Sequence, residues 1–262
     1  MHRTTAFSCT VAVALVFACA LDAAEPAPAD ASPEAREVAE RAIAAMGDAE
    51  AWDGVRLVRF GFAGRRNHAW DRSTGLHRVE GETREGERYV VIHDLDGDSS
   101  STEERQGRAW LDGQEVSGER AAELLENAYG AWVNDTYWLL MPRKLLDPGV
   151  HLAHEGTETI DGREHDVLML TFGEVGLTPG DRYWAYVDRE SDLMTRWAYR
   201  LQSQAEDAEP TVWEWQGWSW YEAGDHRVRL ADRRQQVGND RVLDLSPIEI
   251  SDRVPDGLFD AP

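Results

Sequence analysis

The chain has 262 residues, and its 49 acidic side chains against 27 basic ones give a formal net charge of −22. A surface this acidic repels phosphate backbones and anionic headgroups, so nucleic acid is not expected as a partner. The length suits one large β domain as well as two small ones.

Residues 1–24 have the pattern of a secretory signal segment. Arg3 gives a basic start, and residues 6–20 form an apolar run that is too short to span a bilayer. Small residues at Ala18 and Ala20 fit cleavage after Ala20, and Ala23-Ala24 offers a second site. We therefore expect export to the periplasm or cell envelope, with no transmembrane helix in the mature chain.

Both cysteines, Cys9 and Cys19, lie inside this segment, so the mature chain has no intramolecular disulfide and depends on its core. Residues 16–19 resemble a bacterial lipobox, in which Cys19 would carry the lipid of an outer-membrane lipoprotein. The alternative is that Cys19 is only a small residue of the signal. Residues 25–31 form an Ala/Pro tether, and 32–262 are expected to form a single domain.

Two stretches show helical spacing. The first begins after Ser32, an N-cap residue type, has proline at its first helical position and ends at Gly47. The second covers residues 117–140, and Pro142 stops it. Asn134-Asp135-Thr136 is expected to break this second stretch into two helices.

Period-two alternation predicts strands in the rest of the chain. The predicted strands are 55–60, 68–79, 89–92, 108–111, 151–159, 166–172, 182–187, 194–202, 211–221, 226–235 and a last piece near 248. Asp112-Gly113 and Asp161-Gly162 are expected at hairpin tips, and 172–181 as an ordered loop. About ten strands with three helical segments and no β-α-β order indicate an α+β fold on one large antiparallel sheet.

The chain contains 11 tryptophans. Each can bury roughly 150–250 Å², and its indole N–H needs an acceptor. One interpretation is a bulky filled core, and the other is an aromatic cavity that binds a hydrophobic ligand. The candidate cavity residues are Trp110, Trp132, Trp138, Trp184, Trp197, Tyr199, Trp213, Trp215, Trp218 and Trp220.

The tryptophans at 213 and 215 differ in parity from those at 218 and 220, so strict alternation would place the two pairs on opposite faces. A β-bulge at Gln216-Gly217 would insert one residue and bring all four onto one face. We expect this bulged strand to face the helix that carries Trp132 and Trp138.

No catalytic, metal or cofactor site is predicted. Neither Gly-x-Ser-x-Gly nor a phosphate-binding glycine loop occurs in the sequence. His151 and His154 fall on opposite faces of a strand, and residues 94–98 lack the spacing of a calcium loop. A hydrolase stays open as an alternative, because triads are defined by geometry and not by sequence position.

Several segments together carry a family resemblance. They are Asn134–Leu139, Pro142–Leu145, Asp147–Gly149, Thr171–Tyr183, Trp70-Asp71 and Pro255–Pro262. On these segments the chain resembles secreted bacterial domains of unknown function akin to the outer-membrane lipoprotein-sorting proteins. The resemblance covers nearly the whole mature chain. It implies the fold of the carrier LolA, an unclosed antiparallel β-barrel covered by helices, whose concave face holds acyl chains.

These observations favour an exported periplasmic or membrane-tethered protein that binds a lipid or other hydrophobic molecule in the concave face of its sheet, without catalysis. The alternatives are a secreted hydrolase of a small ester or glycan and an envelope interaction domain with a filled core. A fold alone does not decide among these functions.

Overall fold

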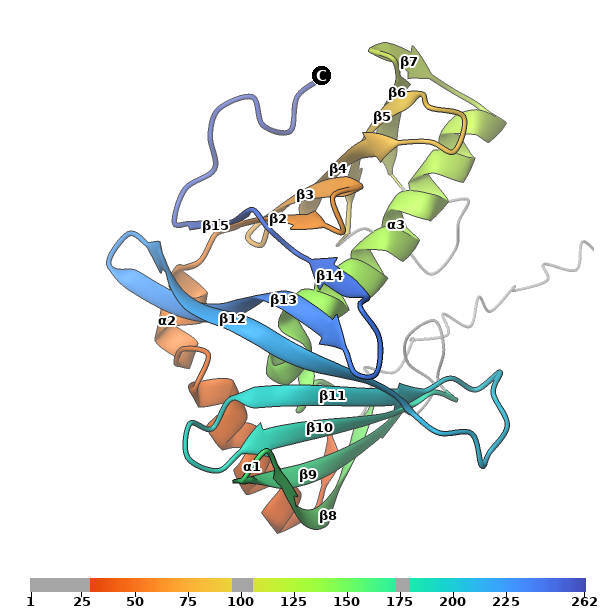
Figure 1. Ribbon diagram of the computed structural model, residues 1–262. Helices are drawn as coiled ribbons and strands as arrows, with labels where there is room; N and C mark the ends of the chain where they lie inside the picture. The colour runs from red at the N-terminus through yellow and green to blue at the C-terminus, as the bar shows by residue number, and fades with distance from the viewer. Residues whose placement is uncertain (1–28, 96–105, 173–179) are drawn as a thin grey trace, which may run out of the picture.

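The computed structural model describes residues 29–95, 106–172 and 180–262. The expected signal segment, Cys19, most of the expected tether and most of the loop at 172–181 lie outside these ranges. Within them, the strands form two sheets that lie side by side (Figure 1). We call the sheet of eight strands the large sheet and the sheet of seven strands the small sheet.

The large sheet is antiparallel except for the parallel pair of β1 and β8. Its strands, in spatial order, are β1 (Asp30–Ala31), β8 (Val150–Ile160), β9 (Arg163–Phe172), β10 (Arg182–Asp188), β11 (Met194–Arg200), β12 (Thr211–Ala223), β13 (His226–Gln236) and β14 (Val242–Asp244). The small sheet is antiparallel throughout. Its order is β15 (Ile248–Ser251), β2 (Leu57–Phe62), β3 (Arg66–Asp71), β4 (Leu76–Glu82), β5 (Arg88–Asp94), β6 (Gly107–Leu111) and β7 (Gln114–Val116).

The two sheets meet where the chain passes from β14, an edge of the large sheet, to β15, an edge of the small sheet. Backbone hydrogen bonds close this junction: Gly61 N–H donates to the carbonyls of Leu245 (3.1 Å) and Pro247 (3.0 Å), and Ala63 N–H donates to that of Asp244 (2.7 Å). The other edges, β1 and β7, do not pair with each other in the described ranges. The expected α+β architecture, an unclosed antiparallel barrel with helices, is confirmed. The strands form two sheets and not the single sheet that was expected.

Helices cover one face of this barrel, which we call the inner face. They are α1 (Pro33–Ala44), α2 (Ala49–Gly54), α3 (Glu119–Leu140) and the 3₁₀ helix η2 (Met141–Lys144). Ser32 caps α1 as expected, since its Oγ accepts from Ala35 N–H at 3.2 Å. No helix in the described part of the chain is long and apolar enough to cross a membrane.

The helix α3 is continuous, which corrects the expected break at residues 134–136. Thr136 Oγ1 donates to the carbonyl of Trp132, one turn back, so this hydroxyl is satisfied without leaving the helix. Asp135 points into the protein and accepts hydrogen bonds from Arg66 on β3. Both polar side chains therefore have partners that a helix can accommodate.

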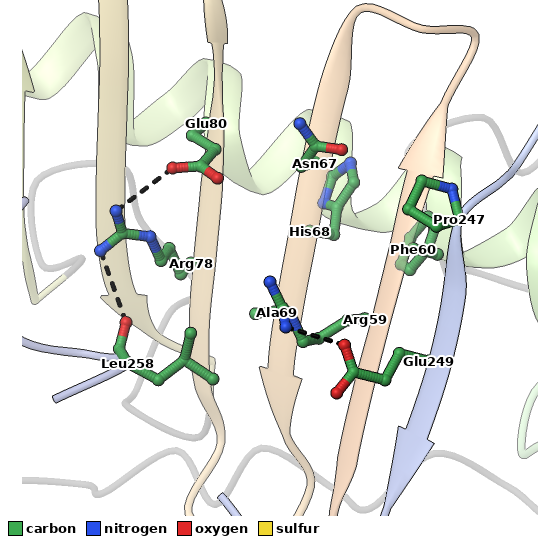
Figure 2. A pocket seen from close by; sticks show the side chains of 10 residues that line it. All are labelled: Arg59, Phe60, Asn67, His68, Ala69, Arg78, Glu80, Pro247, Glu249 and Leu258. Atoms are coloured by element: carbon green, nitrogen blue, oxygen red, sulfur yellow. Dashed lines mark hydrogen bonds and ion pairs between the residues drawn. The ribbon is translucent and has the colours of Figure 1, made fainter. Parts of the chain in front are cut away.

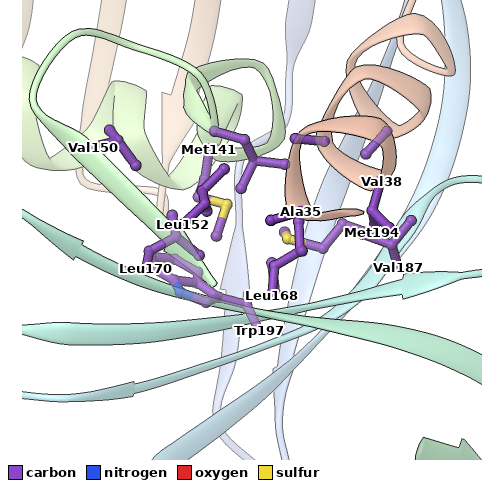
Figure 3. Close-up of a cluster of buried hydrophobic side chains, with 14 of the residues drawn as sticks. Ala35, Val38, Met141, Val150, Leu152, Leu168, Leu170, Val187, Met194 and Trp197 are labelled. Carbon is purple, nitrogen blue, oxygen red and sulfur yellow. The ribbon is translucent and has the colours of Figure 1, made fainter. Parts of the chain in front are cut away.

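Three hydrophobic clusters hold the layers together. The first lies between α1, η2 and the large sheet, where Ala35 and Val38 pack near Leu168, Val187 and Met194 (Figure 3). The second joins α2, the end of the hairpin of β12 and β13, and the strands β2 and β15. The third packs Leu124, Leu125 and Ala128 of α3 on Val79, Val91 and Ala109 of the small sheet. Figure 1 shows α3 running along both sheets.

Both predicted Asp-Gly turns lie at hairpin tips. Asp112 and Gly113 join β6 to β7 with φ values of 47° and 79°, and Asp161 and Gly162 join β8 to β9 with 51° and 81°. Positive φ at both central residues is what a two-residue hairpin turn of type I′ requires. The expectation for these two turns is confirmed.

The predicted bulge in β12 is wrong. The pairing of β12 with β13 keeps one register from Trp213 opposite Gln236 to Ala223 opposite His226, so no residue is inserted. Gly217 instead has a φ of 71°, and a Cβ there would lie 1.9 Å from Oδ1 of Asp232. The strand is therefore distorted at the expected place by backbone conformation and not by an extra residue.

Candidate functional site

The inner face of the large sheet carries a group of aromatic side chains near the carboxyl end of α3. We call it the aromatic cluster, and it consists of Tyr137, Trp138, Phe172, Tyr183, Trp197, Tyr199, Trp213, Trp215 and Trp218. Two of these residues come from α3, and the others come from four neighbouring strands, β9 to β12. Register places Trp197 opposite Trp213, so the indoles form a continuous surface across strands.

Half of the ring pairs in the cluster meet edge to face, and most of the others are tilted. Trp138 of α3 has its ring centroid 4.5 Å from that of Trp197 and 5.3 Å from that of Trp213. The Trp197 ring stacks on Tyr183 at 5.4 Å and lies 6.0 Å from Trp215. These separations are in the range in which aromatic pairs attract each other.

The cluster has a buried floor and a half-buried rim. Trp197, Trp213 and Trp215 form the floor, and each is 3% exposed or less. The rim residues keep part of their surface accessible, and they are Tyr137, Trp138, Phe172, Tyr183, Tyr199 and Trp218. The aromatic surface is therefore reachable from solvent at its rim.

Six of the ten candidate cavity residues come together in this cluster: Trp138, Trp197, Tyr199, Trp213, Trp215 and Trp218. Trp215 and Trp218 have ring centroids 6.0 Å apart, although their positions differ in parity, with Gly217 between them at φ 71°. Three of the four tryptophans of β12 that were expected on one face, Trp213, Trp215 and Trp218, therefore do share the inner face.

The other four candidates lie elsewhere. Trp110 follows Ala109, which packs under α3, and so lies on the opposite face of the small sheet. Trp132 packs edge-on against Trp70, with ring centroids 5.9 Å apart. Trp184 donates from Nε1 to Glu155 at 3.0 Å on the outer face, and Trp220 is 45% exposed beside two arginines.

The cluster contains hydrogen-bond donors without acceptors. The indole N–H groups of Trp197, Trp213, Trp215 and Trp218 are buried and have no hydrogen-bond partner among the described residues. By contrast, Trp52 Nε1 donates to the carbonyl of Met46 at 3.1 Å. Since the great majority of buried polar groups are paired, four such donors in one cluster call for acceptors that the described residues do not supply.

A buried cation, Arg234, lies against the aromatic cluster and was not among the predicted site residues. Arg234 is separated from Val228 and Leu230, two fully buried residues of the same strand, by an even number of positions. Strand alternation therefore predicts that its side chain points to the same face as theirs. Its guanidinium lies over the ring of Trp215, 3.5 Å from the centroid. Burial holds the pKa of Arg234 well below its ordinary value, while Asp232 acts in the opposite direction.

A second group of buried polar side chains lies under α3 on the small sheet. Asp135 accepts from Nε (2.8 Å) and Nη2 (3.0 Å) of Arg66, and it lies 2.9 Å from Nε2 of His68. Nδ1 of His68 is 3.0 Å from Nε2 of His77, and Nδ1 of His77 is 2.7 Å from Nε2 of His93. We call these five residues the histidine network.

Burial lowers the pKa of His68. Burial also lowers the pKa of His77 well below its ordinary value, and the neighbouring imidazoles of His93 and His68 lower it further. Both imidazoles are therefore neutral at pH 7. The five side chains of the histidine network include neither a hydroxyl nor a thiol, the nucleophiles of serine and cysteine hydrolases. In the described ranges, no group of three or more His, Cys, Asp or Glu side chains could hold a metal ion.

On the outer face of the small sheet, a polar pocket of about 290 Å³ lies between β2, β3, β4 and the carboxyl-terminal segment (Figure 2). Arg59 pairs with Glu249 at 2.8 Å, and Arg78 pairs with Glu80 at 3.2 Å and donates to the carbonyl of Leu258 at 3.4 Å. The charges that line this pocket thus neutralise each other, in contrast to Arg234.

No family model and no curated protein matches the chain. Several solved structures are similar to the chain. A DUF1329 family protein from Desulfovibrio piger is 12% identical, with 86% of this chain and 97% of that chain covered at a TM-score of 0.40. A LolA superfamily protein from Nitrosomonas europaea is also 12% identical, with coverages of 86% and 96% at a TM-score of 0.39.

A third similar structure is the putative outer membrane lipoprotein-sorting protein domain from Vibrio parahaemolyticus, at 8% identity, coverages of 85% and 97%, and a TM-score of 0.32. These proteins carry the names of the group that the sequence resembles.

Proposed function

We propose that this chain is an exported cell-envelope protein whose folded domain, residues 32–262, binds a lipid or other hydrophobic molecule on the aromatic cluster and performs no catalysis. The observation that carries the proposal is the set of four buried indole N–H donors on one aromatic surface for which the residues at 29–95, 106–172 and 180–262 provide no acceptor. Residues 1–24, with their signal pattern, support the location.

The chemistry of the cluster defines the kind of ligand. Aromatic faces and edges favour apolar chains, while unpaired N–H groups favour oxygen acceptors such as ester or acid carbonyls. A ligand that carries both would cover the half-buried rim and satisfy donors that otherwise stay unpaired. An acyl lipid has this combination, and a sugar or a peptide backbone does not offer the long apolar part.

The test starts with the processed protein purified from the envelope of its expression host. Native mass spectrometry before and after solvent extraction should show a mass shift that disappears with extraction, and the extract should contain an acyl compound. The extracted protein should then raise the fluorescence of 1-N-phenylnaphthylamine, a neutral hydrophobic probe. Absence of both the bound mass and the probe signal would refute the proposal.

Matched tryptophan variants locate the site. Trp197→Phe and Trp215→Phe keep an aromatic ring but remove an unpaired N–H inside the cluster, so we expect weaker binding of the extracted lipid. Trp184→Phe is the control, because Trp184 is on the outer face and its N–H already has an acceptor. Equal affinities for all three variants would place the ligand elsewhere.

A further inference from the structure

Arg234 lies where the large sheet, α3 and the aromatic cluster meet. It is directly opposite Trp215 in the register of β12 and β13, and its side chain is fully buried. Nη2 donates to the carbonyl of Trp138 at 2.7 Å, and Nη1 donates to that of Arg233 at 3.1 Å. The guanidinium is thus held rigidly against the floor of the cluster.

The charge of Arg234 has no carboxylate partner among the described residues. Asp232 acts on it only through space, and no ion pair joins the two. Other buried ionic sites differ: Asp135 meets Arg66, and Asp166 meets Arg41 at 3.0 Å. An arginine stays protonated in proteins, and burying an unpaired charge is costly.

The protein compensates this charge only in part. The carbonyl of Trp138 belongs to the last turn of α3, where the helix dipole favours a cation, and the ring of Trp215 adds a cation–π contact. Nε of Arg234 is buried and has no hydrogen-bond partner within the described part of the chain. One charged donor therefore stays open next to the unpaired indole donors.

We propose that the ligand of the aromatic cluster is an acidic hydrophobe, whose carboxylate or phosphate oxygen accepts from Nε of Arg234 while its apolar chain lies on the aromatic rings. This inference rests on the proposed function and names the ligand class for the same site. A charge-assisted hydrogen bond to an anionic oxygen is shorter and stronger than one between neutral groups. This anionic oxygen would neutralise the charge of Arg234, which has no carboxylate partner in the described ranges.

The test compares three ligands with the same eighteen-carbon chain and different headgroups: oleic acid, oleyl alcohol and oleyl phosphate. Their dissociation constants are measured on the solvent-extracted protein by displacement of 1-N-phenylnaphthylamine, below the micellar concentration of each. We expect at least one of the two anions to bind about tenfold or more tightly than the alcohol. Preference for oleate or for oleyl phosphate separates a fatty acid ligand from a phosphate-bearing lipid.

Variants then assign the preference to Arg234. Arg234→Met should bring the anions to the affinity of the alcohol, and Arg234→Lys should restore part of the preference. Arg233→Gln is the matched control, since Arg233 is exposed on the same strand. If Arg234→Met does not fold, the affinities of the three ligands for the unaltered protein and for Arg234→Lys still show whether an anionic headgroup is preferred and whether Arg234 sets that preference.

The outcomes separate the two proposals. Equal binding of acid, alcohol and phosphate by the unaltered protein would overturn the acidic ligand but leave the hydrophobic site intact. A preference that survives in Arg234→Met would also overturn it. Binding of none of the three would refute the proposed function, and this inference with it.

Discussion

Asp135 on α3 and Nε2 of His68 on β3 lie 2.9 Å apart, and neither side chain has any exposed surface. The same carboxylate receives two hydrogen bonds from Arg66. One side chain of the helix therefore holds two side chains of the sheet. This contact fixes the height and the rotation of α3 above the small sheet.

Removing this carboxylate should destabilise the protein strongly. Asp135→Ala leaves the guanidinium of Arg66 and the imidazole of His68 without their shared partner, and breaking a buried ion pair in this way costs about 3–5 kcal/mol. We expect this loss in the free energy of unfolding, measured by urea denaturation. Glu115→Gln removes an exposed partner of Arg108 and should leave the denaturation midpoint nearly unchanged. Similar midpoints for both variants would contradict the central role of Asp135.

The histidine network should make stability depend on pH. The pKa values of His68 and His77 lie below the ordinary value of 6.5 in the folded protein, so the unfolded chain binds more protons between that value and the folded pKa. Stability is therefore full above pH 6.5 and falls as the pH drops below it, by up to about 1.4 kcal/mol per pH unit for each such histidine.

The measurement is the free energy of unfolding from about pH 7.5 down to about pH 5.5. His77→Asn should flatten the dependence, because the variant has one buried imidazole fewer to protonate on unfolding. His151→Gln, a change at a half-exposed histidine of β8, should keep the original slope. A slope that is the same in all three proteins would show that the network does not control it.

Gly217 should tolerate no side chain. Gly217→Ala combines a φ of 71° with a Cβ that would lie 1.9 Å from Oδ1 of Asp232, and we expect a loss of about 1–3 kcal/mol in thermal or urea denaturation. The double variant with Asp232→Ala should recover part of this loss. Gly130→Ala is the control, since nothing lies within 4 Å of its Cβ, and alanine should stabilise α3 by up to about 1 kcal/mol.

Arg41 should hold α1 on the large sheet. It pairs with Asp166 of β9 at 3.0 Å and also donates to Asp192, in the turn between β10 and β11. Arg41→Met should raise the hydrogen-exchange rates of the α1 amides, because two contacts with the sheet are lost. Arg36→Met, which removes only a hydrogen bond to the carbonyl of Ala29, should not change them. Equal exchange in both variants would contradict this role.

The sequence predicts most of the local structure because local signals determine it. Ser32 caps its helix, the two Asp-Gly pairs form hairpin turns, and alternation locates the strands. The break expected at residues 134–136 failed because the partners that satisfy Asp135 are 67 and 69 residues away in the chain. A polar residue inside a helix can be interpreted only when such distant partners are known.

The candidate site shows the same limit. Tryptophan content predicts an aromatic surface, but the register and the twist of the strands decide which indoles share it. Trp218 joins Trp215 through the local backbone at Gly217, while Trp184 points to the other face. Tyr183 and Arg234 were missed, although each lies in a strand whose alternation places it with inner-face residues.

The 22 residues of α3 give it a length of about 33 Å, enough to pass from one sheet to the other. Its last turn brings Trp138 into the aromatic cluster on the large sheet, and its amino-terminal half packs Leu124 and Leu125 on the small sheet. The two sheets thus share α3 as a common packing partner. A substitution that loosens either end of α3 should therefore lower the stability of both sheets.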